Sequence, residues 1–249
     1  MPQVKVGIQL IIYGERVRED LASVLSEVKS CGFEGIETGN LFNISPPDRV
    51  MELLREHDLS VAAVHVGYSD VADEEKLSKH IEYLKRVGGK FLICSGVAQA
   101  EGIKAYEVAA ETFNAVGKRC MSEGLTFCYH NHAWEFEQFD GVKGIHRLAE
   151  LTDPELVRLC VDVYWVTVGG EDPVEFIQRY ISRSPYFHFK DGAPGEFTEL
   201  GKGKVNLAGC LQAALAANAE WIIYEQDRTS KPVIESIQES REYLRKLGV

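Results

Sequence analysis

The stretch Phe127-Cys128-Tyr129-His130-Asn131-His132-Ala133-Trp134-Glu135-Phe136 changes from apolar to polar as it is read from its first residue to its last. Its opening residues are typical of a buried strand, and two histidines follow at alternate positions. Because residues two apart on a strand point to the same face, His130 and His132 are expected to aim at one place. A strand that ends in convergent imidazoles predicts a polar site, and such a site needs partners from elsewhere in the chain.

Later apolar segments end in polar side chains in the same way. One ends at Asp162, another at His188 with Lys190 two residues further on, and a third at Glu225. Helical patterns separate these segments, so strands and helices alternate along the chain. Alternation of this kind predicts parallel strands. The carboxyl ends of parallel strands meet at one edge or mouth, so we expect these side chains to form one site.

The whole chain follows this alternation. We expect strands at 4–10, 35–37, 59–66, 91–95, from 127 onward, and at 156–161, 186–189 and 221–224, and helices at 20–30, 46–57, 73–87, 102–123, 142–150, 173–179, 207–217 and 232–247. A long glycine-containing loop is expected at 191–204. Eight such units in 249 residues is the usual size of a (β/α)8 TIM barrel, and no linker divides residues 1–249, so we predict a single domain.

A doubly wound open sheet is the competing fold. The positions of the polar strand ends favour the closed barrel, because they occur on the second, third, fifth, sixth, seventh and eighth predicted strands. In a closed barrel all of these ends ring one mouth, where barrel enzymes carry their chemistry. In an open sheet they would spread along an edge.

Composition excludes several classes of protein. Hydrophobic residues make up 45% of the chain and charged residues 26%, which is typical of a globular domain. The net charge of -11 predicts no nucleic-acid partner. No apolar run is long enough to cross a membrane, and the first residues enter a strand without a secretory signal. The six cysteines form no CxxC pair, which indicates free thiols and a cytoplasmic location.

Four of the polar strand ends suit a metal ion. His130, Asp162, His188 and Glu225 form a mixed nitrogen and oxygen set of the kind that binds one divalent ion, such as Mn2+, Co2+, Zn2+ or Mg2+. Without an ion, Asp162 and Glu225 are expected to repel each other in a shielded pocket and to raise a pKa. Each residue alone is better explained as a hydrogen-bonded strand end. The convergence of all four favours a metal site.

Three residues are candidates for catalysis. Glu225 is the predicted base, because a carboxylate can coordinate an ion through one oxygen and accept a proton through the other. His132 is the predicted acid, since an unshifted imidazole titrates near neutrality; a ligand role, a hydrogen bond that holds His130, and a plain loop position stay open. Lys190 is expected to hold a substrate oxygen, with a rim pair to Asp191 as the alternative.

Three further residues are candidates for substrate binding. His65 and Glu37 are expected to bind sugar hydroxyls, although Glu37 fits a structural hydrogen bond equally well. Trp165 is expected to offer an apolar face to a sugar ring, with packing at the rim as the alternative. The Gly201-Lys202-Gly203-Lys204 run lacks the spacing of a phosphate-binding P-loop and favours a mobile loop over the mouth. Glu135 is interpreted as a surface charge.

At these residues the chain resembles the sugar phosphate isomerase/epimerase family of xylose isomerase-like TIM barrels. The resemblance covers nearly the whole chain, and the segments that carry it are Gly7-Ile8-Gln9-Leu10, Gly32-Phe33-Glu34-Gly35-Ile36-Glu37, Tyr129-His130-Asn131-His132, Asp162-Val163-Tyr164-Trp165, His188-Phe189-Lys190-Asp191, Glu199-Leu200-Gly201-Lys202-Gly203 and Tyr224-Glu225-Gln226-Asp227. The resemblance implies one divalent metal ion at the C-terminal mouth, with ligands at Asp162, His188 and Glu225.

One position departs from the ketose epimerases of this family. Their fifth strand ends in a glutamate that binds metal and moves a proton, and His130 stands at that place here. The chain looks more like the branch that contains inosose dehydratase. The resemblance therefore implies an isomerase, epimerase or dehydratase that acts on a keto-sugar or keto-inositol through an enediolate.

Two alternative functions were weighed beside this one. An enzyme like endonuclease IV, which repairs DNA, is disfavoured by the net charge of -11. A non-catalytic sugar-binding barrel is the other alternative. In either sugar-related reading the partner is a small-molecule carbohydrate, and the sequence leaves open whether the chain is a monomer or a homo-oligomer.

Overall fold

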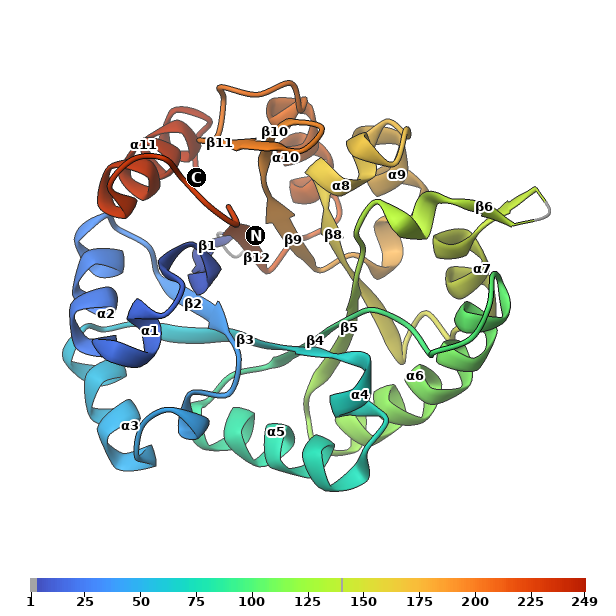
Figure 1. The fold of residues 1–249 in the computed structure, drawn as a ribbon, viewed down its shortest axis with the longest axis horizontal. Coiled ribbons are helices and arrows are strands. Elements are labelled where there is room, and N and C mark those ends of the chain that lie inside the picture. Colours follow the sequence, from blue (N-terminus) through green and yellow to red (C-terminus); the bar gives the residue numbers. More distant parts are fainter. Residues whose placement is uncertain (1–3, 140) are drawn as a thin grey trace.

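Eight parallel strands close into a barrel in a computed structural model that describes residues 4–139 and 141–249. Around the barrel the strands follow the order β1-β12-β9-β8-β5-β4-β3-β2. Their bounds are β1 (Lys5–Gln9), β2 (Gly35–Thr38), β3 (Ser60–Gly67), β4 (Phe91–Ser95), β5 (Thr126–His130), β8 (Val157–Asp162), β9 (Tyr186–Phe189) and β12 (Trp221–Tyr224). Helices form a ring outside the strands (Figure 1). The predicted single-domain (β/α)8 TIM barrel is therefore confirmed.

Eight main helices cover the barrel. They are α2 (Leu21–Ser30), α3 (Pro47–Glu56), α5 (Glu74–Val87), α6 (Lys104–Ser122), α7 (Gly144–Leu151), α9 (Pro173–Arg179), α10 (Leu207–Ala216) and α11 (Val233–Lys246). In α5 the Asp73 side chain accepts hydrogen bonds from two backbone N–H groups of the first turn, and the helix ends at Gly88 with φ 71°. Its buried residues include Leu77, Ile81 and Leu84, which recur at helical spacing and pack toward the strands.

The strands are apolar on both faces because each face is covered. Side chains that point outward pack under the helices in one large core. Side chains that point inward fill the barrel in a second cluster, which consists of Ala62, Ala63, Phe91, Ile93, Cys128, Cys160, Tyr186, Trp221 and Ile223. This burial on both faces explains the nearly continuous apolar runs of the strands.

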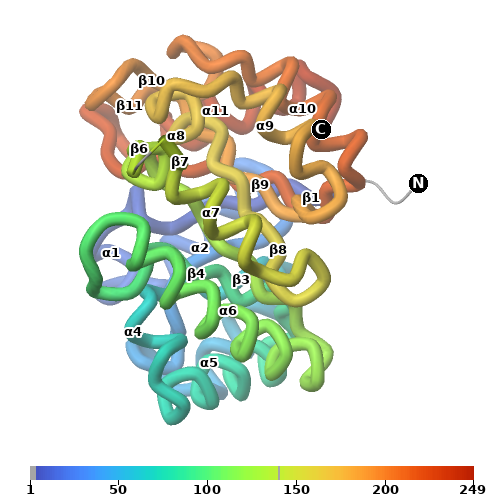
Figure 2. The backbone as a smooth tube through the Cα atoms, turned by 90° about the vertical axis from the view of Figure 1, so that its right-hand side faces the viewer, coloured from blue at the N-terminus to red at the C-terminus, as the bar shows by residue number. Residues whose placement is uncertain are grey.

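Short elements lie between the main ones. They are the helices α1 (Arg16–Glu19), α4 (Tyr68–Val71) and α8 (Val163–Val168), the hairpins β6–β7 (Gln138–Phe139 and Val142–Lys143) and β10–β11 (Asp191–Ala193 and Glu196–Thr198), and 3-10 turns at Leu10–Tyr13, Leu41–Asn43, Trp134–Phe136 and Ile181–Arg183. In Figure 2, α1, α4, α8 and the two hairpins lie toward one side of the barrel, and the C-terminal end of the chain lies toward the other.

The sequence pattern located the main elements within a few residues, and β4, α9, β9 and β12 match residue for residue. Two predictions about connections were wrong. The segment 191–204 is not a loop throughout, because β10 and β11 form an antiparallel hairpin within it. The helix expected from 142 begins at Gly144, because Val142 and Lys143 pair with β6. Strands of two or three residues are too short to show a periodic pattern.

Two expectations from composition can be compared with the fold. All six cysteines are free and buried. Among the described residues, none of the helices combines the length and the apolar character that a membrane span requires.

Candidate active site

The polar residues at the mouth of the barrel continue the inward-facing rows of its core. In each strand a core residue precedes the polar residue by two positions, so both side chains lie on the same face. The pairs are Ala63 and His65 in β3, Cys128 and His130 in β5, Cys160 and Asp162 in β8, Tyr186 and His188 in β9, and Ile223 and Glu225 at the end of β12. The same alternation of side chains along each strand therefore fills the barrel and places the site residues at its carboxyl end.

The four predicted metal ligands meet at this end. His130, Asp162, His188 and Glu225 each offer one ligand atom, and these atoms all lie within 4.8 Å of one another. The Nε2 atom of His130 is 3.6 Å from Oδ2 of Asp162, and Nδ1 of His188 is 2.6 Å from Oε2 of Glu225. All four side chains are buried. We call these four residues the ligand cluster.

The donor set fits a divalent ion. Within the described part of the chain, Oδ2 of Asp162 and both ring nitrogens of His130 are buried without a hydrogen-bond partner. Buried polar atoms are nearly always paired, so several unpaired ones around one point indicate a missing partner. Two imidazoles with two carboxylates suit zinc, manganese or cobalt, and the carboxylates also suit magnesium.

The electrostatics of the ligand cluster support the same interpretation. Burial raises the pKa of Asp162 to about 6, and the charge of Glu225 adds to the rise while Lys190 opposes it. The predicted effect of two carboxylates in a shielded pocket is therefore present. Burial also drives the pKa of His130 well below its ordinary value, with the neighbouring His188 and His65 acting in the same direction. His130 is thus neutral, which is the form that binds a metal ion.

Both carboxylate oxygens of Glu37 make hydrogen bonds to other side chains of the protein. Its Oε2 accepts hydrogen bonds from Nε2 of His188 at 2.9 Å and from the Tyr186 hydroxyl at 2.8 Å, and its Oε1 lies 2.8 Å from Nδ1 of His65. The residue is completely buried. Glu37 therefore orients His188 and His65 instead of binding sugar hydroxyls, and the substrate-binding role predicted for it does not fit the structure.

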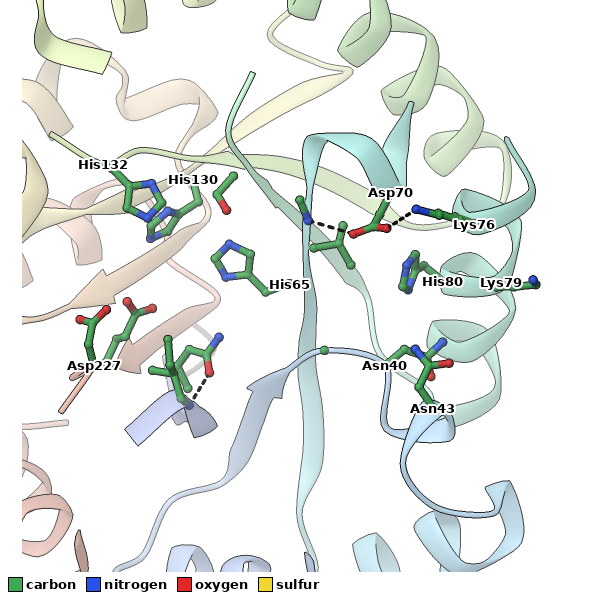
Figure 3. Close-up of a pocket in the computed structure, with 17 residues that line it drawn as sticks. Asn40, Asn43, His65, Asp70, Lys76, Lys79, His80, His130, His132 and Asp227 are labelled. Atoms are coloured by element: carbon green, nitrogen blue, oxygen red, sulfur yellow. Dashed lines mark hydrogen bonds and ion pairs between the residues drawn. The ribbon is translucent and has the colours of Figure 1, made fainter. Parts of the chain in front are cut away.

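His65 keeps one side available for substrate. Its Nε2 has no hydrogen-bond partner among the described residues, and the residue lines the main cavity. The ring lies between the ligand cluster and the outer part of that cavity, with His130 at a centroid distance of 5.0 Å (Figure 3). The predicted substrate-binding role of His65 stays a prediction.

Lys190 serves Glu225 more directly than it serves the open cavity. Its ammonium lies 2.9 Å from Oε1 of Glu225 and also contacts Asp227, and the residue is only 1% exposed. The ring of Phe197 lies 4.7 Å from Nζ of Lys190 and that of Trp165 lies 4.9 Å away. Burial alone would lower the pKa of Lys190, but the surrounding carboxylates outweigh it, so the side chain stays charged.

Lys190 in turn determines the charge of Glu225. Burial alone would raise the pKa of Glu225, but the ammonium of Lys190 and the ring of His188 outweigh it and hold this pKa well below its usual value. Glu225 is therefore a carboxylate at neutral pH. In this structure Lys190 positions the Glu225 carboxylate, and its predicted contact with a substrate oxygen stays a prediction.

His132 lies at the wall of the cavity between two indoles. Its ring stacks on Trp134 at a centroid distance of 3.9 Å and lies 5.7 Å from Trp165. Burial lowers the pKa of His132 to about 3, and the neighbouring His130 adds to this effect. The expectation of a pKa near neutrality was therefore wrong, and the ring is neutral at pH 7. Trp165 lies behind His132 and does not itself line the cavity, so its predicted contact with a sugar ring stays a prediction.

Glu135 was misinterpreted as a surface charge. It is completely buried, and its carboxylate accepts hydrogen bonds from the Tyr129 hydroxyl at 2.6 Å and from the backbone N–H of His132 at 2.8 Å. The residue thereby fixes the turn that carries His132. The sequence did contain a signal, because Glu135 stands three residues after His132, the spacing at which a side chain caps a tight turn.

Asn131, Asp227 and Tyr186 are further site residues without a predicted role. The Asn131 amide exchanges two hydrogen bonds with the backbone of Asp162 and so ties the ends of β5 and β8 together. Asp227 and Tyr186 each stand two residues from a predicted site residue, so the strand period could have identified both.

The glycine run after β11 is organised by a carboxylate of the chain itself. Asp191 is buried and accepts hydrogen bonds from the backbone N–H groups of Gly192, Gly201, Gly203 and Val205. A phosphate-binding loop needs such N–H groups to be free. The structure therefore agrees that Gly201-Lys202-Gly203-Lys204 is not a phosphate site.

A cavity of about 670 Å3 opens above the ligand cluster. His130, His132, His65, Glu225 and Asp227 line its inner end. Figure 3 shows a second group of polar side chains on the far side of His65, contributed by the β2–α3 connection, α4 and α5. A concave site with convergent polar groups and shifted pKa values is the usual form of an enzyme active site.

The comparisons with known proteins agree with this geometry. A sequence profile of the xylose isomerase-like TIM barrel family matches residues 25–247. The chain is 27% identical over 298 residues to inosose dehydratase of Mesomycoplasma hyopneumoniae strain J, with 99% of this chain and 97% of that protein covered. It is 30% identical over 200 residues to inosose dehydratase of Geobacillus kaustophilus, with 72% of this chain and 63% of that protein covered.

Solved structures show the same fold. A sugar phosphate isomerase/epimerase from Parabacteroides distasonis superposes with a TM-score of 0.82 at 21% identity, with coverage of 98% and 94%. An L-ribulose 3-epimerase superposes with a TM-score of 0.78 at 15% identity, also with coverage of 98% and 94%. Together with the curated relatives, these neighbours confirm the prediction of an enzyme from the isomerase, epimerase and dehydratase group. The chain belongs to the xylose isomerase-like TIM barrel family.

Proposed function

We propose that this protein is a divalent-metal-dependent enzyme that removes the proton next to the carbonyl of a keto-sugar or keto-inositol, passes through an enediolate and eliminates water. The observation that carries the proposal is the ligand cluster, whose unpaired buried atoms converge at the inner end of the cavity. Dehydration is preferred because the relatives that cover most of this chain are named inosose dehydratase. The substrate is a small carbohydrate.

His130, Asp162, His188 and Glu225 are the residues that would hold the ion. When bound, a divalent ion polarises a carbonyl and makes the neighbouring C–H group more acidic. Glu37 contributes by fixing the ring of His188 through its Nε2, which leaves Nδ1 facing the other three ligands.

Glu225 is the proposed base. It lines the cavity and is ionised, because Lys190 and His188 outweigh the effect of burial on its pKa. Lys190 fixes the orientation of this carboxylate through Oε1. A base held in one position and one charge state is ready to accept a proton from a substrate placed above the cluster.

His132 is proposed to donate a hydrogen bond to the leaving hydroxyl, which departs as water with the proton that Glu225 has accepted. Because the pKa of His132 is lowered to about 3, its ring is neutral at pH 7 and acts as a hydrogen-bond donor. Trp134 and Glu135 hold this ring and its backbone in place. His65 is proposed to bind a substrate hydroxyl through Nε2, which has no partner among the described residues. Trp165 is proposed to cover the apolar face of the sugar.

Isomerisation or epimerisation is the second candidate, favoured by the close superposition on proteins named as epimerases. It begins with the same proton removal and differs only in where the proton returns. His130 replaces a second carboxylate at the fifth strand, so a symmetrical exchange between two carboxylate bases is not available in this cluster.

The test combines metal analysis with hydrogen exchange. The purified protein is expected to contain about one equivalent of a divalent ion, and Asp162→Asn is expected to contain little, because it lacks one ligand charge. In D2O the wild type should exchange the proton next to the carbonyl of a ketose or keto-inositol, and product analysis then separates dehydration from isomerisation. Glu196→Gln, on the exposed hairpin strand β11, is the matched control. Equal, negligible metal in all three proteins, or no exchange with any member of the panel, would contradict the proposal.

A further inference from the structure

The cavity is larger than one sugar ring needs. Its volume of about 670 Å3 corresponds to roughly twenty water molecules at about 30 Å3 each. A six-carbon sugar has roughly a dozen non-hydrogen atoms, so a keto-sugar bound at the ligand cluster leaves much of this volume free. The remaining space lies beyond His65, away from His130 and His132 (Figure 3).

Polar side chains line this outer part. Asn40, Asn43, Asp70 and His80 all border the cavity, and we call them the distal group. Figure 3 shows them on the opposite side of His65 from the ligand cluster. Asn40 uses its side-chain oxygen to accept the N–H of Phe42, which leaves the amide nitrogen as a donor. Asn43 is exposed at the rim.

His80 is the most informative member of the distal group. It is only 8% exposed because it lies on the buried face of α5, between Leu77 and Leu84, and its Nδ1 has no hydrogen-bond partner within the described residues. Burial lowers the pKa of His80, so its ring is neutral. A neutral imidazole offers one donor and one acceptor, which together match a hydroxyl group.

The lysine side chains beside the distal group already form ion pairs with carboxylates. Lys76 lies 3.2 Å from Oδ1 of Asp70, and Lys79 lies 2.7 Å from Oε1 of Glu75. Asp70 also accepts the backbone N–H of Gly67. An anionic group such as a phosphate would therefore find no unpaired cation among these residues, whereas a neutral hydroxylated group would find donors and acceptors in a nearly neutral environment.

We propose that the distal group forms a second subsite that binds a neutral, hydroxylated unit attached to the reacting keto-sugar or keto-inositol. The natural substrate is then a two-unit conjugate such as a glycoside, with its carbonyl end over the ligand cluster and its second unit beyond His65. This inference rests on the proposed function for the placement of the carbonyl end, and on the cavity lining for the second unit.

Three ketoses that share one reacting end test the subsite. Fructose is the single unit, isomaltulose carries a neutral glucosyl unit on O6, and fructose 6-phosphate carries an anion at the same oxygen. Binding of each to the purified protein is measured by calorimetry. Isomaltulose is expected to bind at least about five-fold more tightly than fructose, a difference that one net hydrogen bond supplies. Fructose 6-phosphate is expected to bind more weakly than isomaltulose.

Variants of the distal group test whether these residues cause the difference in affinity between isomaltulose and fructose. Asn43→Ala changes an exposed side chain, and it is expected to weaken the binding of isomaltulose about five-fold more than that of fructose. His80→Gln, which keeps hydrogen-bonding capacity but changes the geometry, should act in the same direction. Lys85→Ala is the control on the same helix, because Lys85 pairs with Glu123 away from the cavity, and it should change neither affinity.

The outcomes separate the two proposals. Isomaltulose that binds no more tightly than fructose, or not at all, overturns the second subsite. Tighter binding of fructose 6-phosphate than of isomaltulose overturns it as well and indicates an anion site. Deuterium exchange next to the carbonyl is scored separately, so preferential binding of isomaltulose without exchange supports the subsite and counts only against the proposed reaction.

Discussion

His130 and His132 stand two residues apart, yet the structure gives them different tasks. His130 belongs to the ligand cluster, whereas His132 lines the cavity and stacks on Trp134. We therefore predict that His130→Ala loses most of its bound metal. His132→Ala should retain the metal but lose about 100-fold or more in turnover, the usual cost of removing a positioned hydrogen-bond donor from an active site.

Metal content by elemental analysis and turnover on a substrate found in the exchange screen are measured for both variants. Comparable metal loss in both would make His132 a ligand. Near wild-type turnover of His132→Ala would show that His132 lines the cavity without taking part in the reaction. His132→Gln is a useful companion variant, because it keeps a hydrogen-bond donor, and it is expected to recover part of the lost activity.

Glu135 predicts a pH dependence of stability. Burial raises its pKa from 4.5 to about 7, against the opposing effect of hydrogen bonds from Tyr129 and the backbone of His132. Between these values the folded protein holds a proton that the unfolded chain has released. The stabilisation is complete below pH 4.5 and is lost as the pH rises through about 7, by up to roughly 3 kcal/mol for a shift of this size.

The measurement compares wild type with Glu135→Gln, which cannot titrate. Urea unfolding at pH 5 and pH 8 in the presence of a chelator gives the free energy of unfolding of each. We expect the variant to gain stability relative to wild type on going from pH 5 to pH 8. An equal difference between the two proteins at both pH values would show that Glu135 does not titrate in this range.

At the residue scale, the strand period identified the ligand cluster but not the groups that orient it. His130, Asp162, His188 and Glu225 were found because each follows an apolar run, and strand geometry then places them together. Glu135 was missed because it lies past the end of its strand, where the period no longer applies. The only signal in the sequence is its spacing of three residues from His132, which indicates a capped turn but not that the carboxylate is buried.

At the scale of elements, the segment after β9 is built around Asp191. This carboxylate accepts four backbone N–H groups, which belong to both the hairpin β10–β11 and the glycine run that follows. Asp191→Ala leaves these donors without their acceptor, and we predict a loss of about 3 kcal/mol in the free energy of unfolding. Trypsin should also cleave the variant faster at Lys202 and Lys204.

Urea unfolding and timed proteolysis measure both effects. Asp191→Asn serves as the matched control, since it keeps one acceptor oxygen and should lose less stability than the alanine variant. If Asp191→Ala unfolds and is cleaved like the wild type, the hydrogen bonds of Asp191 do not stabilise this segment. The ligand cluster itself lies on other residues, so metal content reports whether the barrel is intact.

Element prediction succeeded where a pattern extends over several residues. Strands β4, β9 and β12 and helix α9 were located residue for residue, because each combines an apolar pattern with clear breaks. The helix α8 was missed since it begins directly after Asp162 and its residues Val163–Val168 are as apolar as a strand. The hairpin β10–β11 was missed because its strands pair with each other and not with the barrel.

At the scale of the whole molecule, closure of the barrel was predictable from the distribution of polar strand ends. Polar strand ends that surround one mouth require a closed sheet. The pairing of β1 with β12 confirms that the sheet closes. The extent of the cavity was not predictable. Its outer part depends on Asn40, Asp70 and His80, which come from a connection, a short helix and a long helix.

The charge of the whole molecule argues against the DNA-repair alternative. The ligand cluster is compatible with either a sugar or a phosphodiester substrate, because both reactions use divalent ions. DNA binding also requires clustered lysine and arginine side chains that replace the counterions of the backbone. The net charge is -11, and at the cavity Lys76 and Lys79 are paired with carboxylates.

We therefore predict that the protein, loaded with its metal, binds a duplex containing an abasic site with a dissociation constant weaker than about 100 µM at roughly 150 mM salt, which is beyond the range of ordinary non-specific DNA binders. Fluorescence anisotropy of a labelled duplex measures this affinity, with an intact duplex as the control. Submicromolar binding that depends on the abasic site would contradict the prediction and favour a repair enzyme. Weak binding to both duplexes leaves the carbohydrate as the substrate, because the same acidic surface that repels a polyanion does not oppose the entry of a neutral sugar.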